Sequence, residues 1–372
     1  MSYDDKTEYG LRSITLREDE EPPQQAPRRR KRRKGTRTVV VILVSLVLLL
    51  GGGLVLTGFL FSEKLGNQVD RIPDAFDIPE ADRPQKVTGA GAGAMNILLA
   101  GSDRRAEVGT TGEGAGDAFE AKGQRSDTMM VLHIAADRKS AYLISIPRDS
   151  WVDIPGEGRN KLNAAYSLGG PKLYIQTVEK ITGLRIDHLA VIDWNGFKAL
   201  TDALGGVSMT FDKEVRAASG ATFGPGTETL TGEEALDYVR ERKHLPGGDF
   251  DRIKRQQNFL RSLMKQTLSN GTITNPVKLT NAMNAVTQNL SVDDKFTTGE
   301  MRDLAIGMRN LRGSGVTFMT VPTKGTGMEG SQSVVYLDEA KARALWSSVR
   351  SDDIATWLAE HGKDEVLGDK VK

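Results

Sequence analysis

Between Thr38 and Ser62 the chain carries no charged side chain, and most residues in this interval are aliphatic. The twenty-three residues 39–61 would span roughly 35 Å as an α-helix, enough to cross a hydrocarbon core of about 30 Å. The apolar part of a cleaved signal peptide is shorter than this, and no small-residue cleavage site directly follows the run. The sequence therefore predicts one transmembrane helix over residues 38–61, retained as a signal anchor.

Basic residues flank this apolar run on one side. Residues 28–34 are all Lys or Arg, whereas only Glu63 and Lys64 are charged close behind the run. The positive-inside rule then places the N-terminus in the cytoplasm and everything after residue 62 outside the cell. A nucleic-acid or nuclear-localisation signal is an alternative reading of the basic run. Beside a membrane span, an orienting role with affinity for anionic membrane lipid is favoured. Residues 1–37 lack apolar periodicity and are expected to form a disordered cytoplasmic tail.

The charge balance and the residue types exclude several classes of function. Residues 1–37 hold eleven Lys/Arg against seven Asp/Glu, so the basic excess of a chain with net charge +1 lies in the tail. The remainder has no whole-domain basic footprint for nucleic acid. The absence of cysteine excludes disulfides, thiolate catalysis and Cys-ligated zinc. The four histidines are scattered, with no pairing typical of zinc or of a Ser-His-Asp triad.

The rest of the chain alternates between strand-like and helix-like patterns. Residues 62–94 contain three prolines and a Gly/Ala alternation, which favours a linker. A catalytic domain is expected over 95–325 and a C-terminal strand and helix extension over 326–372. Strands are predicted at 95–100, 128–135, 141–146, 189–193, 207–211 and 316–321. Helices are predicted at 171–181, 194–204, 231–239, 251–268, 277–288, 298–309 and 338–349. This interleaving predicts an α/β fold with a central mixed β-sheet flanked by helices.

Polar residues stand at three predicted strand ends. Asp103 follows the first strand, Asp127 precedes the second and Arg148 follows the third. If neighbouring strands pair antiparallel, the end of the first, the start of the second and the end of the third meet at one edge of the sheet. Arg125 would then lie beside Asp127 at the same edge. Two carboxylates without His or Cys nearby suit an oxygen-preferring cation, Mg²⁺ or alternatively Mn²⁺. Arginines suit a phosphate group, which they can bind through two hydrogen bonds.

Further arginines follow in two segments. Arg240 and Arg242 are two apart, as an extended segment would present them to one side. Arg252, Arg255 and Gln256 stand at i, i+3 and i+4 and share one face of a predicted helix. Any one of these arginines is more often a solvated charge, but four or five with two aspartates are what a metal–pyrophosphate site needs.

Six segments occur in the order GSDRR, QRSDTMMVLHI, SIPRDSWVDIPG, KLNAAYSLGG, LTGEEALDYVRERK and GGDFDRIKRQQ. Behind a single signal anchor, this set resembles the LytR-CpsA-Psr family over about residues 95–322. The resemblance implies an α/β domain whose deep apolar pocket holds a polyprenyl chain. It also implies a phosphotransferase that moves a glycopolymer from an undecaprenyl-diphosphate carrier onto peptidoglycan through a phosphodiester bond.

The resemblance also implies roles for particular residues. Asp103 and Asp127 are similar to the Mg²⁺-associated carboxylates and, with Arg148, Arg240 and Arg242, would be catalytic. The diphosphate-binding residues implied are Arg125, Arg148, Arg240, Arg242, Arg252, Arg255 and Gln256, with Lys161 and Asn163 from the KLNAAY segment. The resemblance does not identify the general base, for which Asp103, Asp249 and Asp251 are candidates. Strand residues expected along the lipid are Leu98, Met130, Leu132 and Leu143.

Three alternatives stay open at this point. The same site could use water as the acceptor, which would make the protein a polyprenyl-diphosphate hydrolase. The chain could be a non-enzymatic membrane regulator, although its cytoplasmic part shows no helix-turn-helix pattern. It could also be a lipid-binding structural protein. The acidic, Gly-rich stretch 106–124 interrupts the family pattern and could cover the site.

Overall fold

A seven-stranded mixed sheet lies at the centre of the computed structural model, which describes residues 69–102, 126–242, 244–267, 288–308, 311, 315–361 and 366–367. The strand order is β1 (Asp70–Ile72), β12 (Ser291–Asp293), β7 (His188–Ile192), β2 (Met95–Ser102), β3 (Ser126–Ile134), β4 (Ala141–Ser145) and β13 (Val316–Thr320). Strands β2, β3 and β4 pair antiparallel, as predicted, whereas β7 joins β2 and β13 joins β4 in parallel.

The sheet is buried on both faces, which explains why its strands appear in the sequence as continuous apolar runs. Successive residues point to opposite faces, so Ile97 belongs to one hydrophobic cluster and Leu98 to the other. The same alternation separates Met130 from Val131. Two hydrophobic cores therefore lie back to back on the central strands.

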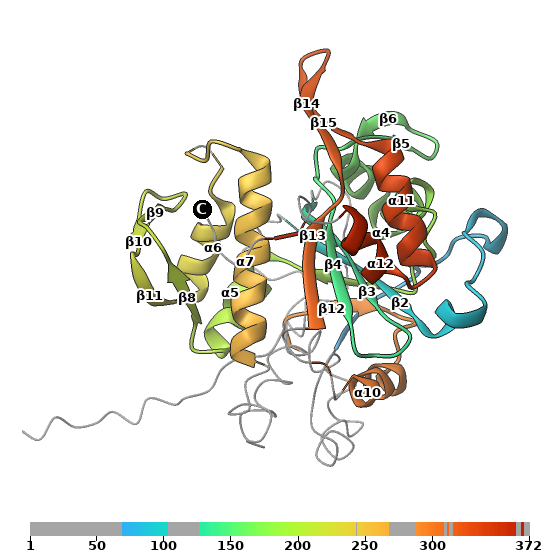
Figure 1. Ribbon diagram of the computed structural model, residues 1–372, viewed down its shortest axis with the longest axis horizontal. Helices are drawn as coiled ribbons and strands as arrows, with labels where there is room; N and C mark the ends of the chain where they lie inside the picture. The colour runs from blue at the N-terminus through green and yellow to red at the C-terminus, as the bar shows by residue number, and fades with distance from the viewer. Residues whose placement is uncertain are drawn as a thin grey trace, which may run out of the picture. The chain divides into compact units, whose positions relative to one another are not determined.

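Helices cover the two faces separately (Figure 1). One face carries α5 (Trp194–Ala203), α6 (Gly232–Arg240) and α7 (Asp249–Thr267). The two-stranded pairs β8–β11 (Val207–Phe211, Gly226–Leu230) and β9–β10 (Val215–Arg216, Thr222–Phe223) accompany them. The other face carries α4 (Leu162–Thr182), α11 (Glu339–Arg350) and α12 (Ile354–His361). Beyond the faces lie α10 (Thr298–Gly307), the short 3₁₀ turns Glu80–Asp82 and Gly89–Gly93, and the hairpins β5–β6 (Trp151–Ile154, Gly158–Lys161) and β14–β15 (Thr323–Glu329, Gln332–Leu337).

The predicted linker was wrong for the part of it that the structure describes. Strand β1 pairs in parallel with β12, so residue 70 contributes to the sheet next to residue 291. Phe76 and Ile78 are buried in the cluster on the α4 face. The boundary expected after residue 325 falls inside β14, and Leu345 of α11 packs into that same cluster. Residues 69–94 and the C-terminal helices are therefore integral to the fold.

Most predicted elements that lie among the described residues are confirmed. The capping box at Thr231 forms and starts α6. The helix predicted from Pro171 is the second half of α4, which breaks at Gly169 and Gly170, where Gly170 has φ of 61°. Proline disfavours helical backbone in the residue before it, so the break falls there. The helix predicted at 277–288 and the transmembrane span over 38–61 lie outside the described residues, apart from residue 288 in a turn. Among the described helices, none is long and apolar enough to cross a bilayer.

Candidate active site

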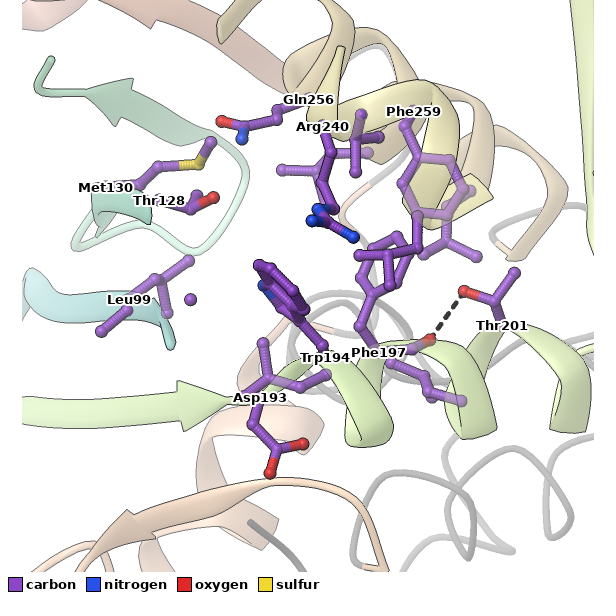
Figure 2. A pocket seen from close by; sticks show the side chains of 18 of the residues that line it. Leu99, Thr128, Met130, Asp193, Trp194, Phe197, Thr201, Arg240, Gln256 and Phe259 are labelled. Atoms are coloured by element: carbon purple, nitrogen blue, oxygen red, sulfur yellow. Dashed lines mark hydrogen bonds between the residues drawn. The ribbon is translucent and has the colours of Figure 1, made fainter. Parts of the chain in front are cut away.

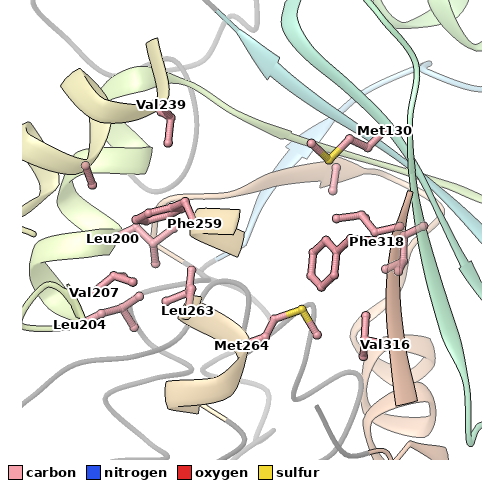
Figure 3. Packing of buried hydrophobic residues seen from close by; sticks show 14 of the residues in the cluster. Met130, Leu200, Leu204, Val207, Val239, Phe259, Leu263, Met264, Val316 and Phe318 are labelled. Carbon is pink, nitrogen blue, oxygen red and sulfur yellow. The ribbon is translucent and has the colours of Figure 1, made fainter. Parts of the chain in front are cut away.

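A cavity of about 530 Å³ lies between the sheet and the helices α5, α6 and α7. This volume is within the range of small-molecule binding pockets. Its wall is mainly apolar, with strand residues such as Leu99 and Met130 facing Phe197 and Phe259 from the helices (Figure 2). Met130, Phe259 and Leu263 belong both to this wall and to the hydrophobic cluster behind it (Figure 3). The cavity is thus a gap left in one of the two cores.

Cationic side chains line part of the same cavity. They are Arg148, Arg240, Arg242 and Arg252, with the amide of Gln256. Burial lowers the pKa of Arg148, and repulsion by Arg252 and Arg242 lowers it further against the opposing effect of Asp149 and Asp249. Guanidiniums that repel one another in a partly dry environment create a strong preference for an anion.

Two carboxylates hold this cluster in place. Asp249 forms an ion pair with Arg252 and lies 4.0 Å from Arg148 Nε. Asp149 Oδ2 lies 3.8 Å from Arg148 Nε, and its Oδ1 lies 3.2 Å from Lys161 Nζ. Of the candidate bases, Asp249 is therefore in the cluster, whereas Asp251 instead accepts hydrogen bonds from Gly247 N–H and Lys254.

Helix α7 is fixed to the sheet by a buried amide. Gln257 Nε2 donates to Ser145 Oγ and to the Met319 carbonyl, both at 2.8 Å. These bonds set the rotation of α7 so that its neighbours Arg252 and Gln256 line the cavity. Arg255, which was also expected to bind the diphosphate, is placed differently. Arg255 is absent from the cavity wall and donates to the Arg216 carbonyl at 2.7 Å, with its guanidinium 4.8 Å from the Tyr238 ring centre.

The C-terminal end of helix α6 positions the other two arginines, Arg240 and Arg242. Arg240 is the last residue of α6, and Glu241 leaves the helix with φ of −57° and ψ of 131°. The two arginines therefore straddle a helix end and are not alternate residues of an extended strand, yet both reach the cavity. The Arg240 guanidinium lies 3.7 Å from the Trp194 ring centre, while the Asp193 carboxylate turns away and accepts from Gly196 N–H (Figure 2).

The predicted meeting of strand ends is confirmed for the backbone. Ser102 at the end of β2 pairs with Ser126 at the start of β3, and Thr128 lines the cavity. The register shifts beside Gly101, so Asp127 lies inside β3 at a bulge and not before the strand. Bulges commonly redirect a side chain next to a functional site. Asp103 and Arg125 lie outside the described residues, as does the Asp127 side chain.

The remaining predicted residues lie near the cluster or away from it. Asn163 N–H donates to the Arg148 carbonyl at 3.0 Å, which joins the start of α4 to the loop that carries Arg148. Of the expected lipid-lining residues, Met130 lines the cavity, Leu132 and Leu143 pack in the cluster behind it, and Leu98 faces the opposite core. Among the side chains that the structure describes, no three His, Asp or Glu groups are arranged to hold a metal ion.

Sequence reasoning did not single out two residues of the site. Asp149 directly follows Arg148 in the sequence. This adjacency was the signal from which a contact between the two side chains could have been predicted. Trp194 follows Asp193, the residue that caps α5, and nothing in its local pattern indicates that it underlies Arg240.

An apolar cavity with a guanidinium cluster in its wall defines a protein that can bind an amphiphile with an anionic head. The family model for LytR-CpsA-Psr proteins matches residues 68–351, so this chain belongs to the LytR-CpsA-Psr family. It is 35% identical over 320 residues to the cell wall biosynthesis protein LcpA of Corynebacterium glutamicum, covering 76% of this chain and 60% of that protein.

Solved structures of the same fold agree with the family assignment. The crystal structure of TagV from B. subtilis aligns with a TM-score of 0.57 and 25% identity, covering 70% of this chain and 97% of that one. A structure described as TagT bound to LI-WTA aligns with a TM-score of 0.55 and 23% identity over 74% of this chain and 98% of TagT, which supports the fold alone. The chain spans about three fifths of the length of the curated relatives LcpA and LcpB.

Proposed function

We propose that this chain is a membrane-anchored, extracytoplasmic phosphotransferase. It would move a glycopolymer from an undecaprenyl-diphosphate carrier onto peptidoglycan through a phosphodiester bond. The observation that supports this most is the guanidinium cluster in the wall of an apolar cavity, because a prenyl diphosphate combines an anionic head with an apolar tail. The name of LcpA, a cell wall biosynthesis protein, and the description of TagT as bound to LI-WTA point in the same direction.

The reaction is a substitution at phosphorus. A hydroxyl oxygen of the acceptor sugar forms a bond to the phosphorus that carries the glycopolymer, and the bond from this phosphorus to the bridging oxygen breaks. Undecaprenyl phosphate leaves, and the hydroxyl proton passes to a carboxylate. Asp249 is the described candidate for this base because it lies within the arginine cluster, 4.0 Å from Arg148 Nε; Asp103 is the other.

The arginines would supply most of the rate enhancement. Negative charge develops on the phosphoryl oxygens in the transition state, and donors already oriented toward these oxygens stabilise it without reorganisation. Arg148, Arg242 and Arg252 are held close enough to repel one another, so an anion bound among them relieves this repulsion.

A divalent cation, Mg²⁺ or Mn²⁺, fits the same proposal. Asp103 and Asp127 would hold it, since β2 ends and β3 begins beside the cavity wall. Bound there, the cation would neutralise charge on the diphosphate. Removal with EDTA should abolish transfer, and Mg²⁺ or Mn²⁺ should restore it. Full activity in EDTA would contradict this assignment.

The function is tested with the full chain in proteoliposomes and a labelled oligosaccharide on a polyprenyl diphosphate. Label should become attached to peptidoglycan, with release of polyprenyl phosphate, and the Arg240→Ala, Arg242→Ala pair should lose this activity. The control is Arg343→Ala, an exposed arginine of α11. Release that is independent of acceptor, with no attached label, would identify a hydrolase. No turnover of the lipid at all would favour a regulator or a lipid-binding protein.

A further inference from the structure

A second surface adjoins the arginine cluster and is formed by the two hairpins β5–β6 and β14–β15. Ser150 forms a parallel bridge with Val335 of β15, and Val335 N–H donates to the Asp149 carbonyl at 2.9 Å. The β14–β15 hairpin is therefore attached directly to the chain that follows Arg148, and it projects from the fold (Figure 1). The base of this hairpin, at Val335, is therefore adjacent to the site.

The strand register places several side chains in one row. Trp151 is paired with Lys161 in β5–β6. The parallel bridge one residue earlier puts Trp151 beside Tyr336 of β15. Residues directly opposite one another on neighbouring strands share a face. We call this surface the hairpin platform and define it by Trp151, Arg159, Lys161, Tyr336, Gly325 and Gly327.

Tyr336 provides a flat aromatic surface at the centre of the hairpin platform. A Cβ atom added at Gly327 would lie 2.4 Å from Tyr336 Cε2, so the ring packs directly on the glycine backbone. The Tyr336 hydroxyl donates to Glu329 Oε1 at 2.9 Å, which fixes the ring along β14. The residue is nevertheless partly exposed. One side of the ring is thus covered by the backbone at Gly327, and the exposed part of the ring offers a surface for stacking.

The chemistry of the hairpin platform suits a sugar more than an anion. Aromatic rings with a polar group offer an apolar face to the C–H groups of a sugar ring and hydrogen bonds to its hydroxyls. Arg159, whose guanidinium donates to the Trp151 carbonyl at 3.4 Å, adds one cationic group. Glu329, which accepts from the Tyr336 hydroxyl, adds one negative charge beside it, and Lys161 is already paired with Asp149. The hairpin platform therefore lacks the cationic excess of the neighbouring cavity.

The hairpin platform and the cavity lie on different sides of the loop with Arg148, which separates the acceptor glycan from the lipid carrier in the proposed transfer. The cavity opens within the hydrophobic cluster on the α7 face, whereas Val152 and Ile154 of β5 pack into the cluster on the α4 face. The loop with Arg148 lies between these two sides. In phosphoryl transfer the attacking and leaving oxygens are roughly in line across phosphorus. If the lipid phosphate leaves toward the cavity, the attacking hydroxyl arrives from the opposite side.

We propose that the hairpin platform binds the acceptor glycan, with one amino-sugar ring stacked on Tyr336 and its chain directed toward Arg148. This inference rests on the proposed function for the identity of the acceptor. It assigns a surface that holds the glycan independently of the lipid carrier.

The experiment measures two ligands on the full chain in detergent micelles. The probes are an N-acetylglucosamine hexamer for the hairpin platform and farnesyl diphosphate for the cavity, each titrated by calorimetry. Tyr336→Ala should weaken hexamer binding roughly tenfold, the scale of a truncated aromatic anchor, and leave farnesyl diphosphate binding unchanged. Tyr336→Phe retains the ring and should bind the hexamer nearly as the wild type does. The matched control is Thr326→Ala, an exposed residue of β14 that alternates with Gly325 and Gly327 and so lies on the other face.

Several outcomes would overturn the proposal. Hexamer affinity that is equal in the wild type and Tyr336→Ala removes it, as does the absence of saturable hexamer binding. A third probe, a soluble phosphodiester-linked glycopolymer, identifies the donor as the occupant if only its binding depends on Tyr336. Normal hexamer binding without farnesyl diphosphate binding would instead refute the proposed function and leave the glycan surface in place.

Discussion

Two buried ionic clusters of this protein are built in opposite ways. In the first cluster, the carboxylate of Glu179 in α4 is 2% exposed. It accepts hydrogen bonds from Arg83, the shortest of them 2.6 Å, and from Ile186 N–H at 2.9 Å. Arg83 also donates to the Ile186 carbonyl. One positive group thus meets one negative group, and the acceptor oxygens are well supplied with donors.

The cluster at the cavity has more cations than anions. Arg148 and Arg252 share Asp249, and Arg242 lowers the pKa of both guanidiniums by repulsion. Burial is the first cause of the lowered pKa in both cases. A balanced cluster stabilises the fold, whereas an unbalanced one keeps binding capacity for an anionic ligand. Substitutions in the two clusters should separate these two roles.

The largest expected effect is on stability, at the balanced cluster. Glu179→Ala leaves Arg83 buried without its partner and should lower the free energy of unfolding by about 3–5 kcal/mol. Urea unfolding of the full chain in detergent, followed by tryptophan fluorescence, measures this loss. Glu157→Ala, at an exposed turn residue, serves as the control. A loss below about 1 kcal/mol would place the Arg83–Glu179 pair among surface ion pairs instead.

The next effect is on catalysis, at the unbalanced cluster. Arg242 lines the cavity and is the proposed donor to the diphosphate, so Arg242→Ala should reduce the transfer rate about 100- to 1000-fold. Because it also removes a repulsive charge, the melting temperature should stay equal or rise. A transfer assay and a thermal scan on the same preparation test both parts. A lower melting temperature with normal transfer would show that Arg242 stabilises the fold and does not serve transfer.

A smaller effect separates two adjacent residues of α7. Arg255→Gln loses a charged hydrogen bond to the Arg216 carbonyl and should cost about 1.5–3 kcal/mol in unfolding free energy, with farnesyl diphosphate affinity unchanged. Gln256→Ala should show the reverse, weaker ligand binding at nearly normal stability. Loss of ligand affinity in Arg255→Gln, with stability intact, would restore Arg255 to the site.

The smallest effect depends on pH and concerns a third buried cluster. Burial alone would raise the pKa of Asp352, but hydrogen bonds with His133 and from Ala136 N–H outweigh it and hold this pKa below its ordinary value of 3.8. The stabilisation is therefore present above about pH 4 and is lost as the pH falls through the lowered pKa. Asp352→Asn tests this, because asparagine also tolerates the local φ of 57°. Its melting temperature should be below that of the wild type at pH 7, and the difference should shrink as the pH falls below 3.8 toward the lowered pKa; a constant difference would exclude a titrating carboxylate.

Much of the fold and part of the site could be predicted from the sequence because the signals are local. Chain direction alone predicts that β2 ends where β3 begins, and the capping box at Thr231 sets the start of α6. The predicted helix face with Arg252, Arg255 and Gln256 was only approximate, because Arg252 and Gln256 line the cavity and Arg255 does not. At 100° per residue, Arg255 lies 60° to one side of Arg252 and Gln256 lies 40° to the other. The buried bonds of Gln257 decide which side faces the cavity.

Other features depend on contacts that no local pattern encodes. Strand β1 has the sequence Asp-Arg-Ile, without an apolar alternation, and exists because Asp70 pairs with Ser291 far along the chain. Strand β14 contains Gly325 and Gly327, which disfavour a strand, yet the Tyr336 ring covers the second of them. The bulge at Asp127 likewise arises from pairing between strands.

The attachment of residues 69–94 to the fold limits how far the site can reach. If the predicted span ends at Phe61, only the seven residues 62–68 separate the bilayer from the folded body. Fully extended, such a tether measures at most about 24 Å. Under the proposed function, a tether this short would confine the site to the membrane surface and to glycan strands within a few nanometres of it, and a longer tether should widen that zone.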